Sequence, residues 1–192
     1  MLLPLFPLSS IVLPGGLMPL RLFERRYIDM LTRCLKNNTG FGVCLIESGL
    51  DAGAPAKPYP IGCSVRIVDF DQGPDGLLHI SIEGDREFRV LTHTIDDNEL
   101  VVGEVEFFDQ CAPLESSDAI DSLSEKLVLI LDFVEPNIRF AERKVNEPDW
   151  VCYRLLELLP LAPQSRFELL DLQQNSVRVD ALAALRIELA RR

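Results

Sequence analysis

The sequence has little positive charge, few histidines and no close pair of cysteines, and each shortage excludes a class of protein. Its 192 residues carry 19 Lys and Arg against 30 Asp and Glu, a formal net charge of -11. Because phosphate backbones and anionic membranes are bound by clustered cations, we expect neither nucleic acid nor a membrane among the partners. The 2 histidines, His79 and His93, lie in separate expected strands, so we expect no metal site.

The 5 cysteines include no C-x-x-C pair, and their number is odd. This pattern favours reduced thiols over disulfides, and therefore a cytoplasmic protein. Cys44 and Cys63 stand within apolar segments, where cysteine commonly acts as a small buried hydrophobic residue. We accordingly expect structural rather than reactive thiols.

Residues 1–30 are rich in Leu but do not read as a membrane helix or an export signal. No Lys or Arg precedes the apolar run, and export signals begin with such a charge. A turn is expected at Gly15 and Gly16, and any helix is broken by Pro4, Pro7, Pro14 and Pro19. We therefore predict two short buried strands, at about residues 5–8 and 17–22, followed by a helix from near Glu24 to about Leu35.

Motifs for nucleotide chemistry are absent from the chain. There is no G-x-x-x-x-G-K-[ST] loop for ATP phosphates, and no Gly-rich dinucleotide fingerprint follows an expected strand. Glu104 and Glu106 share a strand face, but their alternation with Val105 and Phe107 is typical of a solvated face rather than of an acid and base pair. We predict a non-enzymatic, ATP-independent protein without a cofactor.

Alternating apolar and polar residues predict further strands after the first helix. An apolar run at residues 41–46 indicates a central strand, and the Gly and Pro of residues 47–60 indicate a long surface loop. More strands are expected from residue 62, at 78–82, at 86–95 and at 100–108. Because short turns join them, we predict an antiparallel, barrel-like sheet.

The composition changes at residues 111–117, and the apolar residues beyond recur at helical spacing. The last expected helix runs from about Val177 to Leu189. We predict an α+β chain with one early helix, consisting of a β-rich barrel-like subdomain at residues 1–112 and a helical bundle at residues 113–192.

The opening segments, residues 3–8, 13–16, 20–24 and 26–27, resemble those of the N-terminal substrate-recognition domain of the ATP-dependent Lon proteases. This domain also occurs in stand-alone bacterial proteins of about this length. The similarity continues at residues 40–43, 61–62, 75–78, 84–88 and 150–161, so it extends over essentially the whole chain. The resemblance implies a PUA-like barrel with a helical tail, unfolded or hydrophobic polypeptide as the ligand, and a role in protein quality control or client delivery to a partner protease.

Exposed turns and the start of the first helix are the candidate binding segments. Aromatic residues at helical spacing usually pack, so we expect Phe23 and Tyr27 to anchor the helix in the core, with Glu24 as its cap. An open sheet edge could take up an extended peptide through main-chain hydrogen bonds. The candidate peptide-binding residues are Pro14, Gly15, Gly16, Glu24, Arg26, Gly49, Gly53, Pro55 and Arg86.

Two other functions stay open at this point. Barrel-like domains of the PUA-like kind often bind RNA, although the charge balance argues against it here. An enzyme could also hold a small molecule in a pocket that no motif reveals. The sequence identifies neither the client nor the oligomeric state.

Overall fold

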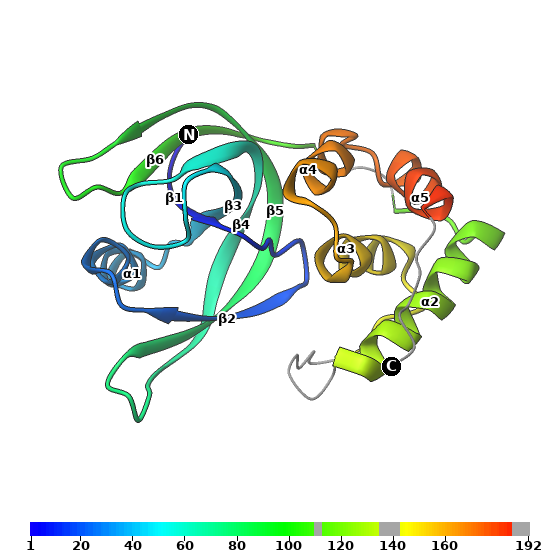
Figure 1. The fold of residues 1–192 in the computed structure, drawn as a ribbon, viewed down its shortest axis with the longest axis horizontal. Helices are drawn as coiled ribbons and strands as arrows, with labels where there is room; N and C mark the ends of the chain where they lie inside the picture. Colours follow the sequence, from blue (N-terminus) through cyan, green and yellow to red (C-terminus); the bar gives the residue numbers. More distant parts are fainter. Residues whose placement is uncertain (110–112, 135–142, 186–192) are drawn as a thin grey trace. The chain divides into compact units, whose positions relative to one another are not determined.

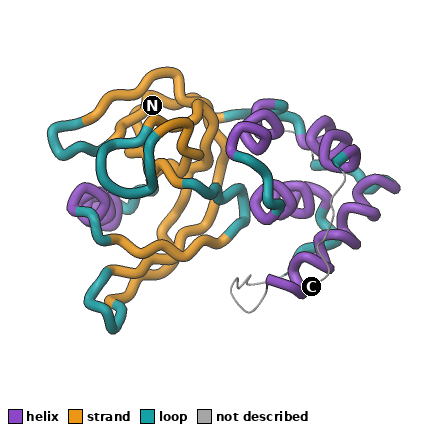
Figure 2. Tube along the Cα trace, viewed as in Figure 1, coloured by secondary structure: helices purple, strands orange, loops and turns teal. Residues whose placement is uncertain are grey.

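The computed structural model describes residues 1–109, 113–134 and 143–185, and the chain divides into two compact units, Met1–Phe108 and Asp109–Arg192. The first unit holds a sheet and one helix, and the described part of the second holds helices (Figure 1). Figure 2 shows the same division by secondary structure. The α+β class is therefore as predicted. The elements of the first unit are β1 Leu2–Leu8, β2 Leu17–Leu22, α1 Arg25–Asn37, β3 Phe41–Ser48, β4 Lys57–Gln72, β5 Leu78–Ile95 and β6 Val101–Phe107.

The six strands form one sheet in the order β2-β5-β4-β3-β1-β6, and β6 also pairs with β5. The strands from β5 through β4, β3 and β1 to β6 thus close into a ring, and β2 lies outside it on β5 (Figure 1). The predicted antiparallel sheet is wrong in one respect, because β1 pairs with β3 in parallel. A parallel pair needs a crossover connection, and β2 with α1 supplies it. The PUA-like detail stays a prediction.

The two strands expected at residues 78–82 and 86–95 are one strand, β5. Gly84 lies within β5 and allows the turn at residues 14–16 to approach. A Cβ at Gly84 would clash with the carbonyl oxygen of Leu13. Gly15 donates from its backbone N to the Gly84 oxygen at 2.9 Å, and Gly84 donates to the Gly16 oxygen at 2.9 Å.

The loop expected at residues 47–60 is shorter than predicted, because β3 continues to Ser48 and β4 begins at Lys57. Pro58 and Tyr59 are buried within β4 rather than exposed in a loop. Pro58 pairs with Ile46 where the register between β3 and β4 shifts, a place at which a sheet tolerates proline. The connection itself comprises residues 49–56.

The core of the first unit lies between α1 and the sheet. The helix buries Tyr27, Met30, Leu31 and Cys34, which pack with apolar residues of β3, β4 and β5. The Tyr27 ring stacks on Phe6 with the ring centroids 3.8 Å apart. The amphipathic spacing of α1 accounts for this face, since residues three and four apart share one side of a helix.

The prediction that Phe23 anchors the helix in the core is wrong. Its side chain is 59% exposed, whereas Leu22, the residue before it, is 1% exposed. Leu22 ends β2 with its side chain toward the core, so the next side chain points to the opposite face. Helical spacing would have placed Phe23 beside Tyr27, but α1 begins only at Arg25.

The cysteines provide a test of the core. Cys34, Cys44, Cys63 and Cys152 are buried, and burial raises the pKa of the Cys44 thiol. Because the thiolate is the reactive form, Ellman's reagent should modify these thiols at least about tenfold more slowly in the folded chain than in urea. The measurement requires the Cys111→Ser variant, since Cys111 lies outside the described residues. Rapid modification of the folded variant would contradict the buried placement.

The second unit contains the helices α2 Asp118–Val134, α3 Pro148–Leu158, α4 Pro163–Asp171 and α5 Asn175–Ala184. Contacts join α2 to α3 and α5, α3 to α5, and α4 to α5. Leu189, predicted in the last helix, lies outside the described residues, and the bundle arrangement stays a prediction. No helix in the described ranges combines the length and apolar composition that crossing a membrane requires.

Buried arginines in the second unit were missed by the sequence analysis. Arg154 and Arg178 are both 0% exposed, and Arg166 is 8% exposed. The Arg178 Nη2 donates to the Leu170 carbonyl at 2.6 Å, and the Arg166 Nη2 donates to the Leu159 carbonyl at 2.7 Å. These carbonyls lie at the ends of α4 and α3, where each also accepts a backbone N–H, from Gln173 and Leu161 respectively, so each arginine adds a second donor at a helix end.

Candidate functional site

The structure brings the predicted binding residues of the first turn close to Arg86. Pro14 bridges to Gly84, two residues before Arg86 along β5. The guanidinium of Arg86 lies over the Phe107 ring, 4.9 Å from its centroid, and Nη2 donates to the Phe108 oxygen at 3.3 Å. Gly15, with a φ of 72°, is exposed at the turn. This part of the prediction therefore corresponds to one surface region that is fixed to β5, except at Gly16, which is buried and was wrongly predicted as a binding residue.

A second group of predicted residues meets around Arg26, which is 5% exposed. Its Nη2 lies 2.8 Å from a Glu24 carboxylate oxygen and 2.8 Å from the Gly53 carbonyl oxygen. Its Nη1 donates to the Glu99 carbonyl at 3.2 Å. Arg26 therefore joins the start of α1 to two loops, and its forked donors are used inside the protein. The expected helix cap is not formed, since the Glu24 side chain makes no capping hydrogen bond.

The remaining predicted residues, Gly49 and Pro55, lie in the loop at residues 49–56. Gly49 has a φ of 113°, which favours glycine at this position. The loop is also held to the segment after β1, because the backbone N of Ser9 donates to an Asp51 carboxylate oxygen at 2.6 Å. With the Arg26 contact, these bonds make the loop part of the folded framework rather than a simple connection.

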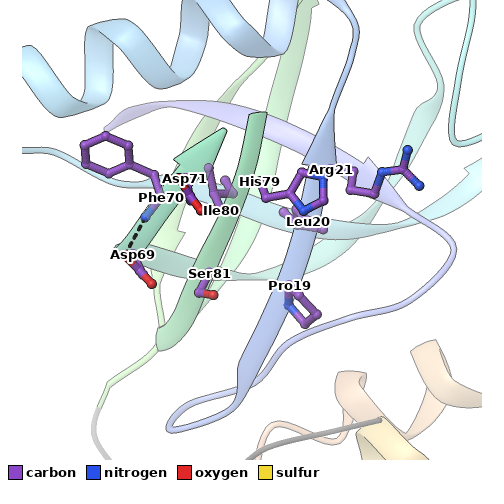
Figure 3. A pocket seen from close by; sticks show the side chains of 9 residues that line it. All are labelled: Pro19, Leu20, Arg21, Asp69, Phe70, Asp71, His79, Ile80 and Ser81. Carbon is purple, nitrogen blue, oxygen red and sulfur yellow. Dashed lines mark hydrogen bonds between the residues drawn. The ribbon is translucent and has the colours of Figure 1, made fainter. Parts of the chain in front are cut away.

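A hollow of about 380 Å³ lies on the strands β2, β5 and β4, and the sequence analysis did not find it (Figure 3). Strand pairing aligns Arg21 with His79 and Asp71 in one row across the three strands. A second row, two residues along, consists of Pro19, Ser81 and Asp69. Leu20 and Ile80, which lie between the rows, pack into the core, so the two rows face outward. The lining of the hollow also includes Leu20, Ile80 and Phe70.

The charges around the hollow are unevenly paired. Arg21 Nη2 lies 2.7 Å from an Asp75 carboxylate oxygen, and His79 Nε2 lies 3.4 Å from the other oxygen. A hydrogen bond from the Leu77 backbone, supported by His79 and Arg21, holds the pKa of the Asp75 carboxyl below its ordinary value. Asp69 and Asp71 are exposed, and each accepts a bond from the backbone N of the next residue. The β4 side of the hollow is therefore acidic.

The end of β4 forms a strand edge. The pairing of β4 with β3 ends at Val65, whereas its pairing with β5 continues to Gln72. Within the described residues, β4 thus has a strand on one side only at residues 67–72, which we call the β4 edge. Val68 and Phe70 on this edge are 45% and 57% exposed. Among the described residues β2 is also an edge strand, with only β5 beside it, but Pro19 has no backbone N–H to donate to an added strand.

The described ranges contain no cluster of metal-binding side chains. No group of three or more His, Cys, Asp or Glu residues that could hold a metal ion occurs there. Glu104 and Glu106 are exposed on β6, as expected for a solvated face. The open strand edges and the hollow are exposed surface features of the first unit.

Comparison with known proteins gives one family. The family model of the ATP-dependent protease La (LON) substrate-binding domain matches residues 2–185. The crystal structure of a Lon N-terminal domain protein from Xanthomonas campestris is 38% identical, with a TM-score of 0.78, over 96% of this chain and 98% of that chain. The N-terminal domain of a Mycobacterium avium complex Lon protease is 14% identical, with a TM-score of 0.62, over 97% of this chain and 100% of that chain. At that lower identity the likeness shows a shared fold.

Proposed function

Because the chain belongs to the Lon substrate-binding domain family, we propose that it binds polypeptide segments and carries out no chemistry on them. Membership of the family confirms the resemblance seen in the opening segments of the sequence. The name of the matched family supplies the class of ligand, and the geometry of the first unit supplies a place for it.

The observation that carries the proposal is the hollow on β2, β5 and β4 together with the β4 edge. A strand edge offers main-chain N–H and C=O groups to an added strand, whatever the sequence of that strand. The hollow of about 380 Å³ beside it can hold side chains that differ from ligand to ligand. Recognition of this kind tolerates many sequences, as selection of varied clients requires.

Unfolded segments fit this surface better than folded proteins. In a folded protein most backbone groups are already paired, so few remain for a new strand partner. The exposed side chains of Val68 and Phe70 add apolar surface that an unfolded client can cover. We extend the proposal to a role in cytoplasmic quality control or client delivery to a protease.

Five of the nine sequence-predicted residues fall into two groups in this proposal. Pro14, Gly15 and Arg86 are at least partly exposed and stay candidates for a second contact region. For Arg26 and Gly53 we propose a structural role instead, since their mutual contact is internal to the unit.

Reduced and carbamidomethylated lysozyme should bind the chain at least about tenfold more tightly than native lysozyme does, a difference of about 1.4 kcal/mol. Both forms carry almost the same net charge, so the comparison isolates unfolding from attraction to an acidic protein. Fluorescence anisotropy of labelled lysozyme provides the measurement, with a poly-uridine oligonucleotide as the test of RNA binding. Equal affinity for the two forms, or tight binding of the RNA alone, would refute the proposal.

A further inference from the structure

The β4 edge carries two carboxylates at alternate positions. Asp69 and Asp71 lie opposite Ser81 and His79 of β5, so both project from the outer face of the sheet. Two residues along a strand span about 6.6 Å. Phe70, between them, lies opposite Ile80 and therefore belongs to the other face.

These carboxylates decide which strands can pair with the edge. Like charges directly opposite each other on neighbouring strands are destabilising. An acidic segment is disfavoured here, and so is a second copy of this edge, which would place Asp against Asp. Arg21, the cation across the hollow, is already paired with Asp75 and does not neutralise the β4 side.

We infer that the β4 edge selects extended segments with Lys or Arg at alternate positions and an apolar residue between them. This inference rests on the proposed function and names the class of segment that it favours. The two cations would meet Asp69 and Asp71 on the outer face. The apolar residue would lie on the other face beside Phe70, which is 57% exposed.

Charge on the scale of the whole chain acts in the same direction. With a formal net charge of -11, the protein attracts basic segments before contact and repels acidic ones. Asp69 and Asp71 turn this general attraction into a local preference, because only a strand in register presents both of its cations to the two carboxylates.

The test uses two fluorescein-labelled peptides that are identical except at their centre, Lys-Leu-Lys in one and Gln-Leu-Gln in the other. The unchanged protein should bind the Lys peptide about three- to tenfold more tightly, and the preference should shrink in 0.5 M salt. The double variant Asp69→Asn with Asp71→Asn should lose most of the preference while it still binds the Gln peptide. Asn keeps the acceptor for the local backbone bonds, so the variant should fold.

A matched control removes the same kind of charge elsewhere. Asp97 is exposed in the connection between β5 and β6, and Asp97→Asn should keep the preference for Lys. Equal binding of both peptides by the unchanged protein, or an intact preference in the double variant, would overturn the inference but leave polypeptide binding in place. If neither peptide binds, the proposed function itself fails.

Discussion

Replacing Phe41 by Ala should lower the free energy of unfolding by about 3–5 kcal/mol, whereas replacing Phe23 by Ala should change it by less than about 0.5 kcal/mol. Phe41 is 0% exposed on β3, and its ring centroid lies 6.2 Å from that of Phe6. Truncation there removes buried apolar surface and leaves a cavity. Phe23 is 59% exposed, so its truncation removes little contact.

Urea denaturation followed by far-ultraviolet circular dichroism measures both variants. A loss of this size threatens a marginally stable protein, so Phe41→Leu serves as a milder core variant with an expected loss of roughly 1–1.5 kcal/mol. Equal losses for the Phe23 and Phe41 variants would contradict the placement of the two rings.

Replacing Arg26 by Met should cost about 3–5 kcal/mol, the usual loss when one partner of a buried ion pair is removed. Glu24, whose side chain is 18% exposed, would lose its counter-charge. The carbonyls of Gly53 and Glu99 would lose their donor at the same time. Thermal and urea unfolding of the variant provide the measurement.

A double-mutant cycle distinguishes the ion pair from general loss of packing. Glu24→Gln combined with Arg26→Met should be more stable than the sum of the two single losses, because no uncompensated carboxylate remains. The stability of the Arg26→Lys variant should lie between that of the unchanged protein and that of Arg26→Met, since Lys keeps the charge but lacks the fork that reaches several acceptors. Strict additivity of the losses would mean that the pair contributes nothing of its own.

Elements set by local pattern could be predicted from the sequence. The alternation around Ile80 and the amphipathic spacing around Met30 depend on nearby residues, and both gave the right kind of element. The parallel pairing of β1 with β3 could not be read in this way, because it depends on where β2 and α1 carry the chain. The close approach of Gly84 to Leu13 could not be read either, since the turn that Gly84 accommodates comes from a distant part of the sequence.

The candidate site needed the structure for a related reason. The sequence showed His79 and Ser81 on the polar face of a strand, which was a usable signal for an outward surface. It did not show that Arg21 and Asp71 come to lie beside His79, because strand registers join segments far apart in the chain. Arg26 was chosen as a binding residue because forked donors are typical of recognition, and nothing local indicated that its partners are loop carbonyls.

Mapping a bound polypeptide by nuclear magnetic resonance tests the central claim most directly. Carbamidomethylated lysozyme is added to the 15N-labelled chain, and amide chemical shifts are followed to saturation. We expect the largest shifts in β2, at residues 78–83 of β5 and on the β4 edge at residues 67–72. Shifts confined to α2, α3, α4 and α5, or no shifts at saturating polypeptide, would contradict the account.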